Sequence, residues 1–377
     1  MLEAMIRVTA VLVMFPVGLA VIGRGGRLGA CAPSDQAIVQ ELQAYLEKAA
    51  AADRFSGAVL FAREGTPLFA KAYGLASKAC NVPNRIDTKF NLGSMNKMFT
   101  AVAIAQLAQA GKLDFSDPLI KHLPDYPNKA VAEKVTLHQL LTHTSGIGDY
   151  FTRKFMETSK DRFRTIQDYF PLFVDKRLEF EPGKKFRYSN AGFMILGAVV
   201  EKVSGQSYFD YVREHIYQPA GMVNTDAYEM DYDTPNLAIG YTKQGAKAGR
   251  ASNRKNNLFM HVVKGGPAGG GFSTVEDLLR FDIALRTHRL LDQKHADIVL
   301  TGKVKMGPRG DIQYGYGFGV TDYRGTRIAG HSGGFPGINS DLAMYLDKGY
   351  TVAVMSNYDP PAAQRVSDKL RELITQP

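Results

Sequence analysis

The stretch Ser94-Met95-Asn96-Lys97 decides how this chain is interpreted, because it has the pattern Ser-x-x-Lys where a helix is expected to begin. Residues three apart share one face of a helix, with Cβ atoms about 5–6 Å apart, so the pattern predicts a hydroxyl and an amine within reach of each other. A serine hydroxyl is a poor nucleophile until a neighbouring group removes its proton. A lysine can accept that proton once desolvation lowers its pKa.

The residues that follow supply this desolvation. From Met98 to Ala110 the chain is mostly apolar on all sides, which indicates a buried helix, and Gly111 is a suitable C-terminal cap. Ser94 would then lie at the positive end of the helix dipole, where a developing oxyanion is stabilised. Because Ser-x-x-Lys also arises by chance and serine is a common N-cap, these residues alone do not establish a site.

A second polar triplet, Tyr188-Ser189-Asn190, lies between a turn signal and another apolar helix. The turn signal is Glu181-Pro182-Gly183, and the predicted helix ends near Gly205. At the entrance to a helix the phenol could relay protons, and the asparagine amide could hold a substrate carbonyl. Taken alone, the triplet is better explained as a helix cap beside a core tyrosine.

A third motif, His331-Ser332-Gly333-Gly334, is expected at the end of a short strand. Its glycines would let a substrate come close to backbone N–H groups, and His331 could offer a positive or hydrogen-bond-donating group. A single histidine is more often structural. Its occurrence after the two other motifs favours a functional role here.

In this order the three motifs resemble those of the serine β-lactamase and penicillin-binding-protein superfamily. Within it the chain looks like the branch of class C β-lactamases, D-Ala-D-Ala carboxypeptidases, D-aminopeptidases and family VIII esterases. The resemblance runs from about Ser56 to Asn357. Further stretches that agree with this branch are residues 111–118, 140–146, 218–222 and 269–273.

The resemblance implies catalytic roles for several residues. Ser94 would be the acyl-accepting nucleophile, and Lys97 and Tyr188 would be the general base and the proton relay, with their order left open. The backbone N–H groups of Ser94 and Gly334 would form the oxyanion hole. The loss of one such donor typically costs about 3–4 kcal/mol of transition-state stabilisation.

The resemblance also implies residues that bind substrate. Asn190 would hold the acyl-side amide, and His331 stands where many relatives carry a lysine, with Gly333 beside it. A histidine in place of this lysine is similar to the motif of some peptidases and esterases, and it weakens the case for penicillin hydrolysis. We expect an apolar acyl pocket lined by Tyr150, Phe151, Tyr316 and Phe335.

We therefore expect a serine hydrolase that acts through a Ser94 acyl-enzyme on small-molecule carboxylic esters or D-amino-acid peptides. Esters rank slightly first, because no arginine or lysine is recognised that would bind a substrate carboxylate. The alternatives are a β-lactamase, a D-Ala-D-Ala carboxypeptidase or penicillin-binding protein, and a non-turnover penicillin sensor or scaffold. The natural substrate and the oligomeric state are not determined by the sequence.

An alternative nucleophile is Ser332. It lies in Gly330-His331-Ser332-Gly333-Gly334, which matches the Gly-x-Ser-x-Gly nucleophile elbow of α/β-hydrolases. Two features oppose it. An elbow opens a helix, whereas Phe335-Pro336-Gly337 follows here. The elbow order also requires a later histidine, and none follows position 331.

Composition and spacing argue against several other classes of function. His138, His143 and Asp149 are close in sequence, but their spacing matches no zinc pattern, and no Walker loop or dinucleotide fingerprint is present. We therefore expect no metal and no organic cofactor. The net charge is +9, and basic residues gather between positions 243 and 264. Aromatic residues are not regularly interleaved with them, so we expect no nucleic-acid partner and at most an acidic envelope surface. The residues of this segment are Lys243, Lys247, Arg250, Arg254, Lys255 and Lys264.

The N-terminus predicts export. Residues 8–22 are mostly apolar after Arg7, which fits the core of a signal peptide better than a membrane span of about 20 residues. Leu28-Gly29-Ala30-Cys31 resembles a bacterial lipobox. Residues 1–31 would then be a signal peptide or a lipoprotein signal, and a lipid on Cys31 would tether the protein to a membrane. We expect a periplasmic or envelope location. With Cys80 as the remaining thiol, no intramolecular disulfide is expected.

The two ends of the chain read as strands and the middle as helices. Residues 57–63 with 68–73, and 342–346 with 350–355, read as hairpins, and residues 36–52 and 362–374 as flanking helices. We expect an α/β (α+β) fold of the β-lactamase/transpeptidase type, with an antiparallel sheet built from both chain ends. One lobe would comprise residues 35–93 and 267–377, and an inserted helical lobe residues 94–266. Gly315, Gly317 and Gly319 alternate with larger residues, which reads as a strand with one bare face.

Overall fold

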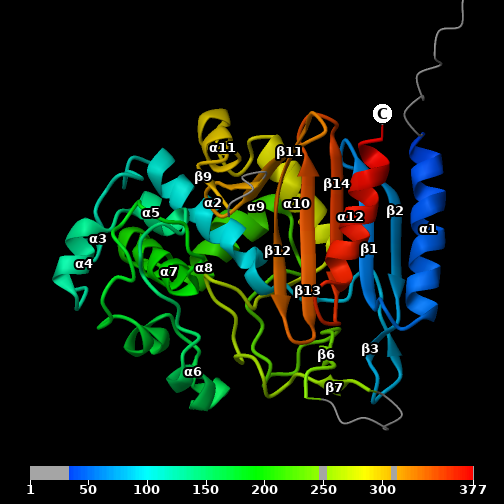
Figure 1. Cartoon of the computed structure of the whole chain (residues 1–377), viewed down its shortest axis with the longest axis horizontal. Coiled ribbons are helices and arrows are strands. Elements are labelled where there is room, and N and C mark those ends of the chain that lie inside the picture. Colours follow the sequence, from blue (N-terminus) through cyan, green and yellow to red (C-terminus); the bar gives the residue numbers. More distant parts are fainter. Residues whose placement is uncertain (1–33, 246–252, 307–311, 377) are drawn as a thin grey trace, which may run out of the picture. The chain divides into compact units, whose positions relative to one another are not determined.

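The main sheet joins the two ends of the chain. In this computed structural model, which describes residues 34–245, 253–306 and 312–376, eight strands lie in the order β2-β1-β14-β13-β12-β11-β10-β9 (Figure 1). Strand β1 (Gly57–Arg63) pairs antiparallel with β14 (Tyr350–Ser356) along its whole length. The predicted antiparallel sheet built from both termini is confirmed.

The remaining strands extend this sheet or form short pairs beside it. In the sheet they are β2 (Thr66–Tyr73), β9 (Val304–Lys305), β10 (Ile312–Tyr314), β11 (Gly319–Tyr323), β12 (Thr326–Phe335) and β13 (Ile338–Tyr345). The short pairs are β3 (Leu75–Ser77) with β4 (Val82–Pro83), β5 (Phe90–Asn91) with β8 (Phe272–Ser273), and β6 (Tyr241–Thr242) with β7 (Lys255–Asn256).

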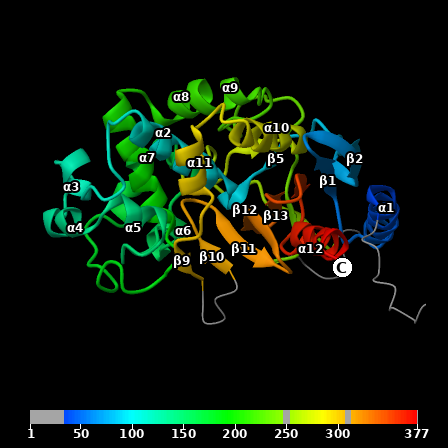
Figure 2. The same ribbon diagram turned by 90° about the horizontal axis from the view of Figure 1, so that it is seen from above.

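Helices cover both faces of the sheet. Helices α1 (Asp35–Ala51) and α12 (Ala362–Ile374) lie on one face, and α10 (Val275–Arg286) packs on β1 and β14 from the other (Figure 2). Alternation along each strand explains the two layers: Val59 and Phe61 join the core under α1 and α12, whereas Ala58 and Leu60 join the larger core on the opposite side.

The middle of the chain is helical and packs around α2 (Asn96–Gln109), whose residues are buried on nearly every side, as predicted. It contacts α7 (Asn190–Ser204) and α11 (Gln293–Val299). The other α-helices are α3 (Leu119–His122), α4 (Lys129–Lys134), α5 (Leu137–Leu141), α6 (Arg153–Glu157), α8 (Tyr208–Val212) and α9 (Gln218–Ala220). Shorter turns are η1 (Gly93–Met95), η2 (Lys160–Arg162), η3 (Gln167–Leu172) and the π-helical η4 (Arg213–Tyr217).

The predicted strand through the alternating glycines is wrong. β10 ends at Tyr314 and β11 begins at Gly319, and the residues between them form a tight turn in which the Gly315 N–H donates to the Phe318 carbonyl at 2.7 Å. Gly317 has φ +73°, and a Cβ on it would lie 2.5 Å from the Lys97 carbonyl oxygen. Packing of this turn onto α2 requires the glycine, because any side chain would collide with the helix backbone.

The predicted leader, residues 1–31 with Cys31, lies outside the described residues. No helix in residues 34–245, 253–306 or 312–376 is both long enough and apolar enough to cross a membrane. The predicted lobe boundaries, at 93/94 and 266/267, stay a prediction.

Candidate active site

Ser94 and Lys97 lie within reach of each other, as their spacing predicts. The helix begins slightly later than expected, because Ser94 sits in the 3₁₀ turn η1 and α2 starts at Asn96. Lys97 Nζ lies 3.3 Å from Ser94 Oγ. The side chain of Lys97 is completely buried, whereas Ser94 is half-buried and lines a pocket.

Glycines bring strand β12 against the turn that carries Ser94. Gly93 has φ +52°, and a methyl group on it would lie only 2.9 Å from the Gly334 nitrogen. A methyl group on Gly333 would lie 2.0 Å from the Leu92 carbonyl oxygen. The turn itself is held by Asn91, whose Oδ1 accepts from the Gly93 N–H at 2.9 Å. The backbones of Ser94 and Gly334 are therefore neighbours, as the predicted oxyanion hole requires.

The edge of β12 next to the site has no strand beside it. β11 pairs with β12 only as far as Gly319 opposite Gly330. From His331 to Phe335, β12 pairs with β13 alone among the described strands. This segment therefore presents backbone groups beside Ser94 that no neighbouring strand uses.

Every hydrogen-bond partner that Lys97 has in the described structure is an uncharged oxygen. Nζ donates to Asn190 Oδ1 at 2.8 Å and to the Ala268 carbonyl, and lies near Ser94 Oγ. It also lies 4.8 Å from the centre of the Tyr188 ring. Burial lowers the pKa of Lys97 to about 7, while the charge of Asp149 opposes this shift. A large share of the amine is therefore neutral at neutral pH, which suits a base.

Tyr188 is held in place by stacking rather than by its hydroxyl. Its ring lies 4.2 Å from the ring of His143, centre to centre, and the His143 Nδ1 accepts from the Ser189 N–H at 3.1 Å. The Tyr188 hydroxyl is buried and forms no hydrogen bond of ordinary geometry with the described residues. Burial raises the pKa of Tyr188, and the nearby Ser94 opposes this rise. The phenol therefore keeps its proton at neutral pH.

Asn190 joins Lys97 to a residue that the sequence analysis missed. The Asn190 Nδ2 donates to Asp149 Oδ2 at 2.8 Å, and the Asn190 backbone N–H donates to the same oxygen at 3.2 Å. Sequence reasoning considered Asp149 only as a metal ligand. Its signal was a lone carboxylate in the apolar context Ile147-Gly148-Asp149-Tyr150-Phe151.

His331 does not offer a positive charge. Its Nδ1 lies 2.6 Å from the Ser332 carbonyl, which can only accept, so this nitrogen carries the proton. Its Nε2, 3.0 Å from the Tyr314 hydroxyl, then accepts from it. Burial and the proximity of Lys97 lower the pKa of His331 well below its usual range. Of the two roles predicted for His331, the positive charge is not favoured here, because the imidazole is neutral and both nitrogens are engaged. A part for His331 in substrate binding stays a prediction.

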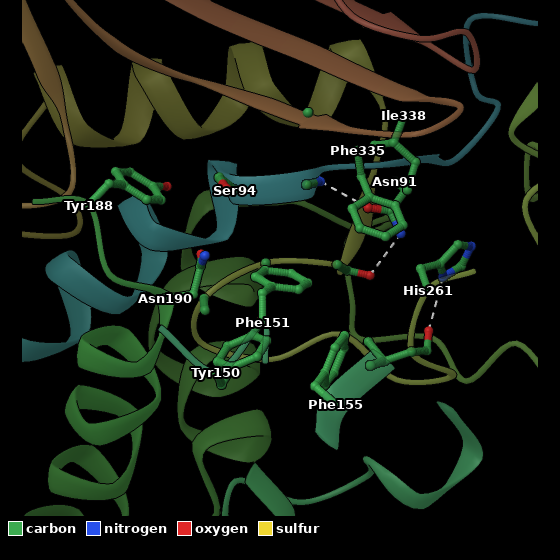
Figure 3. A pocket seen from close by; sticks show the side chains of 16 residues that line it. Asn91, Ser94, Tyr150, Phe151, Phe155, Tyr188, Asn190, His261, Phe335 and Ile338 are labelled. Atoms are coloured by element: carbon green, nitrogen blue, oxygen red, sulfur yellow. Dashed lines mark hydrogen bonds between the residues drawn. The ribbon is translucent and has the colours of Figure 1, made fainter. Parts of the chain in front are cut away.

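A pocket of about 240 Å³ opens beside Ser94 (Figure 3). Its described lining includes no lysine, arginine, aspartate or glutamate. Aromatic side chains form much of its wall, and the rings of Phe151 and Phe335 face each other at 6.2 Å and 26°. The lining residues are Asn91, Gly93, Ser94, Tyr150, Phe151, Phe155, Tyr188, Asn190, His261, Val262, Ala268, Gly269, Gly270, Gly334, Phe335 and Ile338. Tyr150 and Phe335 thus lie where an acyl pocket was expected.

Two predicted substrate-binding residues lie elsewhere. The Tyr316 hydroxyl is 2.8 Å from His138 Nδ1, and its ring packs on Phe115 at 4.7 Å, away from the pocket. Gly333 is buried against Leu92 and its carbonyl accepts from Asn339. The expectation that Tyr316 lines the acyl pocket is wrong, because its hydroxyl and ring are engaged by His138 and Phe115 instead. The predicted role of Gly333 in substrate binding stays a prediction.

Other candidates from the sequence have structural partners. Within the described residues no cluster of histidine, cysteine, aspartate and glutamate could hold a metal ion. In the basic segment, Arg254 pairs with Asp53, and Lys264 with Glu229, so two of its charges are neutralised locally. Lys247 and Arg250 lie outside the described residues.

Comparison with known proteins identifies the family of the chain. The family model described as Beta-lactamase matches residues 36–376. The chain belongs to the β-lactamase family. Penicillin-binding protein 4* of Bacillus subtilis is a family relative, 30% identical over 327 residues, which are 84% of this chain and 71% of that protein.

Solved structures of similar proteins include a penicillin-binding protein from Bacillus halodurans. It is 33% identical with a TM-score of 0.78, covering 91% of this chain and all of that one. A D-stereospecific amidohydrolase from Streptomyces sp. is 28% identical with a TM-score of 0.72, covering 90% of this chain and 98% of that one. The expected β-lactamase-like fold is confirmed, and this member of the family is a serine hydrolase.

Proposed function

We propose that this β-lactamase-family protein hydrolyses uncharged carboxylic esters through an acyl-enzyme on Ser94. The observation that carries the proposal is an aromatic pocket without charged side chains, directly beside a serine that contacts a buried lysine of lowered pKa. Such a pocket favours an apolar acyl group.

Lys97 is the general base in this proposal. A neutral amine has two N–H donors and one lone pair. Asn190 Oδ1 and the Ala268 carbonyl accept the two hydrogens, so the lone pair is left for Ser94 Oγ. Tyr188 retains its proton through burial and acts as the relay. This assigns the two roles whose order the sequence left open.

The reaction follows in two halves. Ser94 Oγ bonds to the ester carbonyl carbon as its proton passes to Lys97, and the carbonyl oxygen becomes negative between the N–H groups of Ser94 and Gly334. The C–O bond to the alcohol then breaks, and the alcohol leaves with a proton from Lys97 by way of Tyr188. Water attacks the acyl-enzyme by the reverse relay and releases the acid.

The uncharged pocket also ranks the substrates. Penicillins and peptides ending in D-Ala carry a carboxylate, and burying an unpaired carboxylate is costly. With His331 neutral, neither the pocket lining nor this histidine supplies a counter-ion. D-amino-acid amides without a free carboxylate are the second substrate class, supported by the likeness to the Streptomyces amidohydrolase.

Intact-mass spectrometry and turnover assays test this function. Wild type and Ser94→Ala are treated with a fluorophosphonate, and turnover is compared for p-nitrophenyl esters, D-amino-acid amides, D-Ala-D-Ala peptides and a penicillin. We expect labelling of wild type alone and fastest turnover of esters. Turnover of D-Ala-D-Ala peptides alone would reverse the ranking, a persistent penicillin adduct would indicate a sensor, and equal labelling of Ser94→Ala would redirect attention to Ser332.

We further propose that the protein is exported to the periplasm or cell envelope, with Cys31 as a lipidated anchor. The support is the apolar stretch after Arg7 and the lipobox-like residues before Cys31. Fractionation of cells that produce wild type or Cys31→Ser tests the anchor. A wild-type protein in the membrane pellet and a soluble variant are expected, and identical fractions would refute lipidation.

A further inference from the structure

We propose that Asp149 is a positioning residue for catalysis: it orients the amide of Asn190 so that Lys97 keeps its lone pair directed at Ser94. The inference rests on the proposed role of Lys97 as base. Asp149 contacts neither the nucleophile nor the pocket, so it acts through Asn190.

The contact between Asp149 and Asn190 selects one of two orientations of the amide. A carboxylate can only accept, so the side of Asn190 that faces Asp149 Oδ2 at 2.8 Å must be its NH₂ group. The carbonyl Oδ1 is then on the side of Lys97, 2.8 Å from Nζ. A turn of the amide by 180° would place two N–H donors beside Lys97.

The orientation of this amide determines what Lys97 can do. With Oδ1 beside it, Nζ donates to Asn190 and to the Ala268 carbonyl, and the remaining tetrahedral position faces Ser94 Oγ. With the amide reversed, Nζ would use its lone pair to accept from Asn190. The serine proton would then have no acceptor, and acylation would slow.

The segment around Asp149 is itself docked on the start of α7. The Phe151 N–H donates to Asp149 Oδ1 at 3.1 Å, and the Ser189 hydroxyl donates to the Gly148 carbonyl at 2.9 Å. Together with the backbone bond from Asn190 to Asp149, these contacts hold the carboxylate at one place. The chain thus offers a rigid acceptor, which a positioning role requires.

Asp149 has a second effect on Lys97, through its charge. The titratable side chains that face Lys97 are Tyr188, His143 and His331, and burial keeps all three uncharged near neutral pH. The negative charge of Asp149 therefore acts against burial and raises the pKa of Lys97. Removal of this charge would lower that pKa further.

The test compares Asp149→Asn, Asn190→Ala and the double variant with wild type on one p-nitrophenyl ester. We expect Asp149→Asn to lower kcat about 10- to 100-fold with little change in KM, because the loss of orientation affects the reacting groups. The double variant should be no slower than Asn190→Ala, because Asp149 acts through that amide. The acid limb of the kcat/KM profile should move to lower pH in Asp149→Asn, since the base loses a charge that favours its protonated form.

Two further variants separate positioning from folding. Asp149→Glu keeps an acceptor-only carboxylate and should retain more activity than Asp149→Asn. Glu157→Gln removes an exposed carboxylate on α6, outside the pocket lining, and should behave like wild type. Melting temperatures and far-UV circular dichroism confirm that each protein is folded.

Wild-type kcat in Asp149→Asn, losses that multiply in the double variant, or an unmoved acid limb would each overturn the positioning role. These outcomes are distinct from failure of the proposed function. If Ser94→Ala is labelled as strongly as wild type, or Lys97→Met remains fully active, the proposed mechanism itself is wrong whatever Asp149 does.

Discussion

Lys97 and Asp282 are both fully buried ionisable side chains, but the protein surrounds them differently. Asp282, on α10 beneath the sheet, forms an ion pair with Arg286 and accepts from the Thr351 hydroxyl. Lys97, on α2, contacts only uncharged oxygens, and Asp149 reaches it through the amide of Asn190.

The two environments shift the pKa values of Asp282 and Lys97 with different compensation. Burial raises the pKa of Asp282, and Arg286 opposes the rise, so the carboxylate is compensated within the structure. Burial lowers the pKa of Lys97 with no direct counter-ion, so a large share of the amine is neutral at neutral pH, at a cost in stability. This is the state that the proposed role as general base requires. A buried ionisable group with a charged partner is typical of a structural role, and one without such a partner is a candidate for a catalytic role.

The largest expected effect is on catalysis. Lys97→Met should lower kcat/KM for a p-nitrophenyl ester by about 10³- to 10⁴-fold, because it removes the general base. Steady-state kinetics beside Ser94→Ala measures this. Arg286→Met, which disturbs the other buried group, is the matched control and should keep its activity per folded molecule. Comparable losses in both variants would erase the distinction between the two sites.

The next effect is on stability. Asp282→Ala should lower the free energy of unfolding by about 3 kcal/mol, because it leaves Arg286 and the Thr351 hydroxyl without their partner. Chemical denaturation measures it. A variant as stable as wild type would show that this buried pair contributes nothing to stability. A loss of specific activity at low temperature, where the variant is folded, would show that the pair also affects the active site.

A third effect is the dependence of activity on pH. Lys97 must be neutral to accept the serine proton, so kcat/KM should fall about tenfold for each pH unit below about 7. The phenol of Tyr188, with its raised pKa, should leave the profile flat through pH 9. An acid limb far below pH 6 would mean that Lys97 is not the group that titrates.

The smallest effect compares the stability of Lys97→Met and wild type at two pH values. The folded pKa of Lys97 lies below its ordinary value of 10.5, so the unfolded chain binds more protons between about pH 7 and 10.5. The free energy of unfolding of wild type should therefore increase relative to that of the variant as pH rises through this range. We expect Lys97→Met to melt a few degrees higher at pH 7 and the gap to narrow by pH 9.5. A gap independent of pH would contradict the lowered pKa.

Short-range sequence patterns predicted the elements that depend on neighbours along the chain. The hairpins at the two ends, the buried helix after Ser94 and the Ser94–Lys97 contact all follow from periods of two or three to four residues. The prediction failed at Gly315 and Gly317, where alternation suggested a strand and the chain instead turns against α2. Gly317 is required by its contact with Lys97 and Ala101 on α2, and Gly315 by the carbonyl oxygens of Val299 and Thr301.

The sequence by itself determined the family, the antiparallel sheet joined from both chain ends, and the serine and lysine that share one helical face, because these depend on local periodicity and ordered motifs. Only the tertiary structure decided the protonation of His331, the exclusion of Tyr316 from the pocket, and the contact of Asp149 with Asn190 on which its proposed role rests. Each of these depends on which partners meet across long separations: Tyr314 with His331, His138 with Tyr316, and Asn190 with Asp149. Hydrogen bonding and burial at such contacts set charge and orientation, and no spacing along the chain encodes them.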